Sequence, residues 1–96
     1  MSPAKQKKLD NLRKKLDYLD NSFIKLIKKR TNLVNEVLKL KNYKNQIVDK
    51  KRIKIILNKI KKKSIKKNID PKITKRIWKN MIWSYIDYEK RNFKKK

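Results

Sequence analysis

The chain has 96 residues and a formal net charge of +24, and it contains no cysteine, histidine or glycine. This length allows one small domain, residues 1–96, whose ends at 1–4 and 93–96 we expect to fray. The missing cysteine and histidine exclude disulfides, thiolate metal sites and a histidine general base. The missing glycine excludes P-loops and dinucleotide-binding loops. With only two prolines there is little turn chemistry, which favours an all-α fold.

The positive charge has two explanations, a nucleic-acid partner or biased codon usage. Lys, Ile and Asn, which have A/T-rich codons, fill 50 of the 96 positions, whereas Ala occurs once. We therefore attribute most of the charge to an A/T-rich genome and expect no specific nucleic-acid partner. A basic helical nucleic-acid-binding protein is the alternative. In either case the charge should attract small anions.

The N-terminal residues Met1–Lys5 lead directly into a charged segment without an apolar stretch. No apolar run approaches the roughly 18 residues of a membrane span. We therefore predict a cytoplasmic protein with no membrane segment.

Residues 5–40 predict one long helix, because apolar residues recur every three or four positions and no proline or glycine interrupts them. At ~1.5 Å per residue such a helix is roughly 54 Å long, whereas a globule of this size has a radius of gyration of about 12–13 Å. The length predicts an intertwined homodimer, and a long monomeric arm is the alternative. The apolar positions are Leu9, Leu12, Leu16, Leu19, Phe23, Leu26, Leu33, Val37 and Leu40.

Two shorter helices follow, over residues 50–67 and 71–92. Asp49 and Asp70 are suitable N-caps, and Pro71 fits the first helical position. The three helices predict a bundle. The residues expected to face inward are Ile53, Ile56, Leu57, Ile60 and Ser64 on the second helix, and Ile73, Ile77, Trp78, Met81, Tyr85 and Phe93 on the third.

Arg30 occupies the position in the first helix where the apolar series would continue between Leu26 and Leu33. A guanidinium in an apolar stripe is costly unless an anion meets it, and no Asp or Glu lies within four residues of it. Either Arg30 bends out to solvent or the anion is a ligand, and we predict the ligand. Arginine is scarce, with 5 against 27 lysines, and its planar group suits carboxylates. Arg13 and Arg52 are therefore further candidates, with an ordinary solvent-exposed charge as the alternative.

Glu89 is one of two glutamates and continues a helical series with Met81 and Tyr85. It is either a carboxyl on a partly buried face or a surface residue paired with a lysine. Lys41, eleven residues after Arg30, falls near the same face of the first helix.

Four segments of the chain, LDNLRKKLDYLDNSFIKLIKKR, LVNEVLKLK, VDKKR and NIDPKITKRIW, resemble the all-helical chorismate mutases. The resemblance covers roughly residues 9–89 and rests on the order and spacing of Arg13, Arg30, Lys41, Asp49 and Arg52. It implies a Claisen rearrangement of chorismate, a small dicarboxylate, to prephenate in an intertwined dimer. It also implies a site without metal, cofactor or covalent intermediate.

The resemblance assigns roles to the cationic residues. Arg30 and Arg52 would bind the substrate carboxylates, and Arg13 would reach in from the other subunit. Lys41 would donate a hydrogen bond to the ether oxygen, where negative charge builds up as the bond breaks.

Two positions depart from the mutase pattern. Glu89 stands where a glutamine usually donates to the ether oxygen, and it can donate only when protonated, so activity should favour acid pH. Ile53 replaces the usual glutamate after the arginine. An aliphatic residue there, and the segment MIWSYI that contains Tyr85, resemble the isochorismate-pyruvate lyases that form salicylate. Asp49 resembles the mutases. We predict the mutase, with Asp49, Ile53 and Tyr85 contacting the substrate, and keep the lyase as the alternative.

Overall fold

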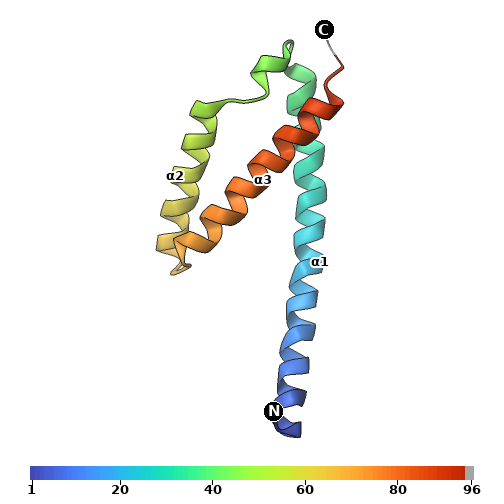
Figure 1. Cartoon of the computed structure of the whole chain (residues 1–96), viewed down its shortest axis with the longest axis vertical. Coiled ribbons are helices and arrows are strands. Elements are labelled where there is room, and N and C mark those ends of the chain that lie inside the picture. Colours follow the sequence, from blue (N-terminus) through green and yellow to red (C-terminus); the bar gives the residue numbers. More distant parts are fainter. Residues whose placement is uncertain (95–96) are drawn as a thin grey trace. The chain divides into compact units, whose positions relative to one another are not determined.

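The computed structural model describes residues 1–94, which fold as helices joined by short segments (Figure 1). The elements are α1 (Pro3–Leu40), a single 3₁₀ turn η1 (Lys44–Gln46), α2 (Lys50–Lys66) and α3 (Pro71–Asn92). No strand occurs between residues 1 and 94. The all-α prediction is confirmed, and each predicted helix ends within two residues of the observed position. Of the ends expected to fray, residues 95 and 96 lie outside the described residues.

The helix ends follow local side-chain chemistry. The carboxylate of Asp49 accepts a hydrogen bond from the Arg52 amide at 2.9 Å, and that of Asp70 accepts one from the Lys72 amide at 2.9 Å. Both predicted N-caps are thus confirmed. After α2, Asn68 adopts a φ of 57°, a left-handed conformation that asparagine tolerates and that commonly ends a helix.

The described chain divides into two compact units, Met1–Leu33 and Val34–Lys96. The first is the N-terminal part of α1. Its apolar stripe is open to solvent, with exposed fractions between 48% and 60% for Leu12, Leu16, Leu19, Phe23 and Leu26. This chain therefore leaves the stripe uncovered, as an isolated amphipathic helix would.

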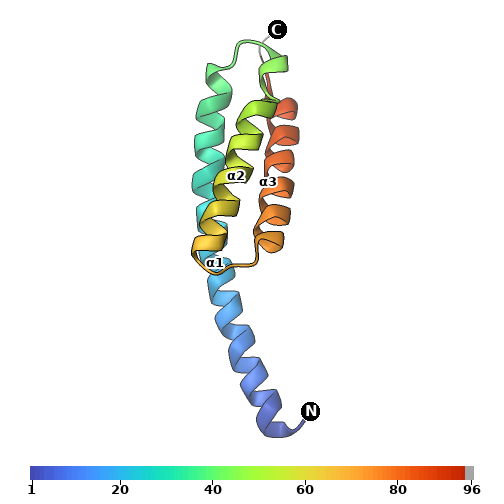
Figure 2. The same ribbon diagram turned by 90° about the vertical axis from the view of Figure 1, so that its left-hand side faces the viewer.

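The second unit contains the last turns of α1, η1, α2 and α3. Helices α2 and α3 run antiparallel and side by side (Figures 1 and 2). Near the turn that joins them, the hydroxyls of Ser64 and Thr74 are hydrogen-bonded at 2.7 Å, and Ser64 is buried. The core is small and consists of Leu38, Ile47, Ile82 and Ile86, with Val48, Ile53, Ile56, Leu57 and Phe93 packed against it.

The predicted inner face of α3 is confirmed only in part, since Trp78, Met81, Tyr85 and Phe93 are half-buried but its first two residues are not. Ile73 and Ile77 are 56% and 47% exposed, whereas Ile82, Ile86 and Glu89 are buried. The cause is that α3 carries apolar residues on more than one side, and α2 covers only the side that includes Ile82. Glu89 therefore lies on the buried face rather than at its margin.

The last turns of α1 show a similar difference. Leu33, Val37 and Leu40 continue the predicted apolar series but are 67%, 48% and 81% exposed. The buried residue of α1 is instead Leu38, which joins the core with Ile47. The face of α1 that meets α3 is thus different from the stripe that the leucine spacing defines.

Candidate active site

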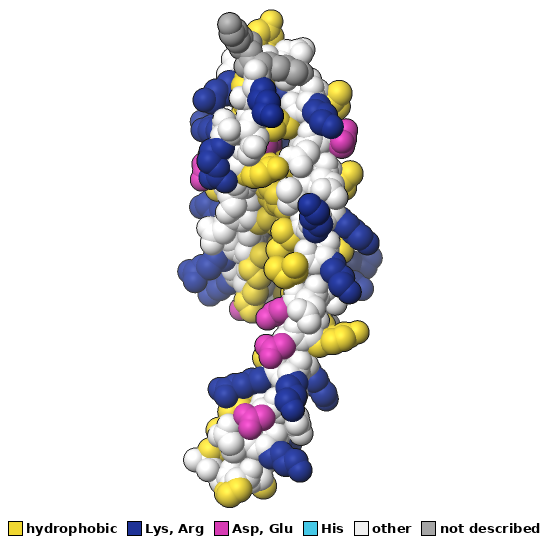
Figure 3. Space-filling model, turned by 90° about the vertical axis from the view of Figure 1, so that its right-hand side faces the viewer, with side chains coloured by type: hydrophobic (Ala, Val, Ile, Leu, Met, Phe, Trp, Pro, Cys, Tyr) yellow, Lys and Arg dark blue, Asp and Glu magenta, His cyan; other side chains and the backbone are white. Residues whose placement is uncertain are grey.

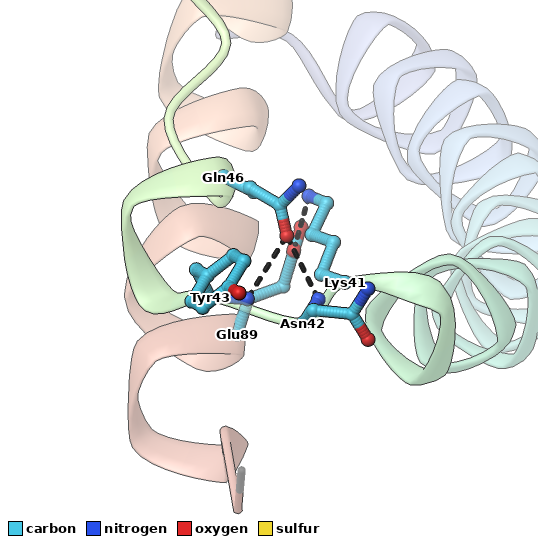
Figure 4. A network of polar contacts seen from close by, with 5 residues as sticks. All are labelled: Lys41, Asn42, Tyr43, Gln46 and Glu89. Atoms are coloured by element: carbon cyan, nitrogen blue, oxygen red, sulfur yellow. Dashed lines mark hydrogen bonds and ion pairs between the residues drawn. The ribbon is translucent and has the colours of Figure 1, made fainter. Parts of the chain in front are cut away.

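Lys41 and Glu89 form an ion pair between the end of α1 and the last turns of α3. The Lys41 Nζ atom donates to Oε2 of Glu89 at 2.8 Å. Figure 4 shows this contact. The two side chains are 19% and 10% exposed, so the pair is largely shielded from solvent. Both residues were predicted as donors to a reacting oxygen. The fold brings these two side chains into direct contact.

A second hydrogen bond, made by the residue before Glu89, joins α3 to the last turns of α1. The Tyr88 hydroxyl donates to Oδ1 of Asn35 at 2.8 Å. The Tyr88 ring meets that of Tyr85 edge to face, with 6.4 Å between the ring centroids and 89° between the planes. Tyr85 is half-buried, whereas Ser84 is exposed and donates to the Asn80 carbonyl. Tyr85, rather than Ser84, therefore belongs to the partly buried side of α3.

Asp49 lies near Lys41. An open depression is lined by Lys41, Gln46, Val48, Asp49 and Lys50. Two predicted site residues, Lys41 and Asp49, thus share one surface hollow, which Lys50 also lines. This arrangement suits a small anion that also carries a hydroxyl group, since the carboxylate can accept a hydrogen bond from it.

Arg52 and Ile53 begin α2 but differ in their surroundings. Arg52 is exposed, and its backbone amide is used by the Asp49 cap. Ile53 is half-buried, packs against the core and also lines a groove along α2 and the start of α3. That groove is lined mainly by exposed lysines and includes Leu57, Asn58 and Pro71; its lysines are Lys50, Lys54, Lys61, Lys72 and Lys75. Ile53 therefore does not share the hollow that contains Lys41 and Asp49.

The remaining predicted residues, Arg13 and Arg30, belong to the unit Met1–Leu33. Arg13 is exposed. Arg30 is half-buried, and its Nε atom is buried. The neighbouring lysines Lys28 and Lys29 are exposed.

Gln46, Asn35 and Tyr88 were not singled out in the sequence. The Gln46 side-chain oxygen accepts hydrogen bonds from the amides of Asn42 and Tyr43, at 2.8 and 2.9 Å (Figure 4). The available signal was weak, because Gln46 lies in a polar segment where a glutamine is ordinary. Asn35 and Tyr88 lie 53 residues apart, and no local spacing relates them.

Residues 1–94 contain no group of three or more carboxylate side chains placed to hold a metal ion. Within the same residues, every helix is too short or too polar to cross a membrane.

Comparison with known proteins gives one consistent result. Residues 12–90 match the family model described as chorismate mutase type II. A chorismate mutase from Methanocaldococcus jannaschii is 37% identical over 76 residues, which cover 78% of this chain and 77% of that protein. No solved structure matched the chain. The matched range includes both Lys41 and Glu89, and the chain therefore belongs to the chorismate mutase type II family.

Proposed function

We propose that this chain converts chorismate to prephenate, and that Lys41 and Glu89 lie at the ether oxygen of the substrate. In this rearrangement the ether C–O bond breaks while a new C–C bond forms, and no proton is transferred. The enzyme accelerates it by holding the reactive conformer and by stabilising the negative charge that develops on the ether oxygen.

The shielded Lys41–Glu89 pair is the observation that supports this proposal most. A lysine ammonium has three N–H donors, and one of them is used by Glu89. The other two remain for the ether oxygen and for a neighbouring substrate group. A fixed ammonium in a site with little solvent stabilises a developing oxyanion more strongly than it would in water.

Family resemblance supports the other roles. Arg30 and Arg52 bind the substrate carboxylates, Asp49 and Tyr85 contact the ring, and Ile53 takes the place of a polar contact. Glu89 donates to the ether oxygen when it is protonated. The measurement is the loss of chorismate absorbance with purified protein, and Arg30→Ala should reduce kcat/KM at least about 100-fold. An active Arg30→Ala variant would show that the arginine does not bind substrate.

The homodimer belongs to the same proposal. Single soluble chains seldom expose long apolar stripes, and the stripe from Leu12 to Leu26 is open in this chain (Figure 3 shows one face, with apolar side chains at the surface among lysines and arginines). We propose that a second copy covers this stripe and that Arg13 enters the partner's site.

Subunit mixing tests the placement of Arg13. Arg13→Ala and Arg30→Ala should each be nearly inactive alone. Random reassociation of the two variants makes half of the dimers mixed, each with one intact site, so activity should recover to roughly a quarter of wild type. No recovery despite exchange of subunits would mean that Arg13 and Arg30 of one chain act in the same site, so that Arg13 does not enter the partner's site.

A lyase acting on isochorismate is the second candidate, and Ile53 is the observation that favours it. An aliphatic side chain cannot hydrogen-bond a ring hydroxyl as a glutamate would. Purified protein incubated with isochorismate should then release fluorescent salicylate. A rate equal to that of buffer would exclude the lyase, and Ile53→Glu should raise the mutase rate if a ring hydroxyl contact is what the site lacks.

A further inference from the structure

Just after the end of α1, two consecutive backbone amides donate hydrogen bonds to one side chain. The Lys41 amide still donates to the Leu38 carbonyl, at 3.1 Å. The next two amides, of Asn42 and Tyr43, both donate to Oε1 of Gln46 (Figure 4). A carbonyl oxygen has two lone pairs, so Gln46 uses its full acceptor capacity here. The backbone immediately after Lys41 is therefore fixed by Gln46.

Gln46 is itself attached to the core. In η1 its amide donates to the Tyr43 carbonyl at 3.1 Å, and the Ile47 amide donates to the Lys44 carbonyl at 3.2 Å. Ile47 is 3% exposed and packs in the core. A continuous set of contacts thus leads from the core through Ile47 and Gln46 to the backbone that carries Lys41.

We propose that Gln46 is a positioning residue, which sets the direction of the Lys41 side chain toward the ether oxygen of the substrate; this rests on the proposed function. The Lys41 side chain is long and has many rotamers, and Glu89 holds only its tip. A substrate whose ether oxygen attracts the ammonium weakens the hydrogen bond between Lys41 and Glu89. The Cα end of the Lys41 side chain must then be held in place by the backbone, and Gln46 holds the backbone that follows Lys41.

A direct contact between Gln46 and the substrate is the competing role, because Gln46 lines the same depression as Lys41 and Asp49. The two roles use different atoms. Positioning uses the side-chain oxygen, which accepts the two amides. A direct contact would use the side-chain NH₂ group, because the oxygen is already occupied.

Three variants separate these roles. Gln46→Met has a similar shape and cannot accept hydrogen bonds from the amides. Gln46→Glu keeps the acceptor oxygens and lacks the NH₂ group. Gln6→Met is the matched control, because Gln6 is exposed and its side chain donates to Asp10 in the first turns of α1.

A misplacement of about 1 Å can lower a rate by up to about 100-fold, so Gln46→Met should lower kcat roughly 10- to 100-fold and change KM less than about twofold. Gln46→Glu should keep kcat within about threefold of wild type, with a higher KM because its charge repels an anionic substrate. Gln6→Met should match wild type. Hydrogen exchange at the Asn42 and Tyr43 amides should accelerate in Gln46→Met and not in Gln46→Glu.

The outcomes distinguish this inference from the proposed function. A wild-type protein that does not convert chorismate would remove both. An active wild type whose kcat is unchanged by Gln46→Met would overturn the role of Gln46 alone. Equal losses of kcat in Gln46→Met and Gln46→Glu, with exchange at Asn42 and Tyr43 still slow in the latter, would assign the NH₂ group a direct contact and overturn positioning.

Discussion

Glu89→Gln separates the charge of Glu89 from its shape. Glutamine has the same length and keeps an oxygen that can accept the hydrogen bond from Lys41, so the side chains can stay in place. What disappears is the negative charge facing the ammonium at 2.8 Å. Because the Lys41 and Glu89 side chains are only 19% and 10% exposed, solvent replaces little of that attraction.

Coulomb's law sets the scale of the loss. Two unit charges about 3 Å apart attract by roughly 5 kcal/mol at an effective dielectric constant of about 20. The cost of removing both charges from water offsets most of this gain, and the variant retains a neutral hydrogen bond to Lys41. We expect the free energy of unfolding to fall by about 1–2 kcal/mol, measured by urea denaturation at neutral pH.

Activity should change in the opposite sense at neutral pH. The Glu89 carboxylate that pairs with Lys41 repels the charge that builds on the ether oxygen, whereas the amide of glutamine can donate a hydrogen bond to it. The kcat of Glu89→Gln should therefore exceed that of the wild type. The assay is chorismate consumption at neutral pH.

Glu36→Gln is the control, since Glu36 is the other glutamate and pairs with Lys39 at 3.3 Å. Both of those side chains are about 70% exposed, and exposed pairs contribute little to stability. Neither the unfolding transition nor kcat should change in this variant. If Glu89→Gln keeps the wild-type kcat, then Glu89 does not face the ether oxygen and its assignment is wrong.

Two further substitutions test the contacts that hold the second unit together. Ser64→Ala leaves the Thr74 hydroxyl without its 2.7 Å partner at a buried position and should lower the unfolding free energy by about 1–3 kcal/mol in urea. The exposed Ser22→Ala is its control, and equal effects would mean that the hydroxyl pair adds nothing. Asp49→Ala removes the cap of α2 and should cost about 1 kcal/mol, with a raised KM for chorismate; an unchanged KM would remove Asp49 from the substrate contacts.

The helix ends could be predicted because their causes are local. An aspartate accepts a hydrogen bond from an amide two or three residues later, as Asp49 and Asp70 do, and an asparagine such as Asn68 tolerates a positive φ. These preferences depend on a few neighbouring residues. A single sequence therefore contains the information that locates the ends of α2 and α3.

The packing of the candidate site could not be obtained in this way. Lys41 and Glu89 are 48 residues apart, and each was selected from its place on its own helix face and from family resemblance, not from a pattern that joins the two. Their contact depends on how the end of α1 meets α3, which Leu38, Ile82 and Ile86 decide together. Gln46 was missed for a related reason, since its role depends on the folded path of residues 42–46.

The apolar positions of α1 and α3 that are open in one chain have a common physical explanation. A periodic apolar pattern identifies a surface that avoids water, but it does not say which chain covers that surface. The leucine stripe of α1 and the residues Ile73 and Ile77 of α3 were predicted to be buried and are open in one chain. If a second copy covers them, as proposed for the dimer, the pattern reflects the assembled protein. The smaller core around Ile86 then serves to fix the contact between Lys41 and Glu89.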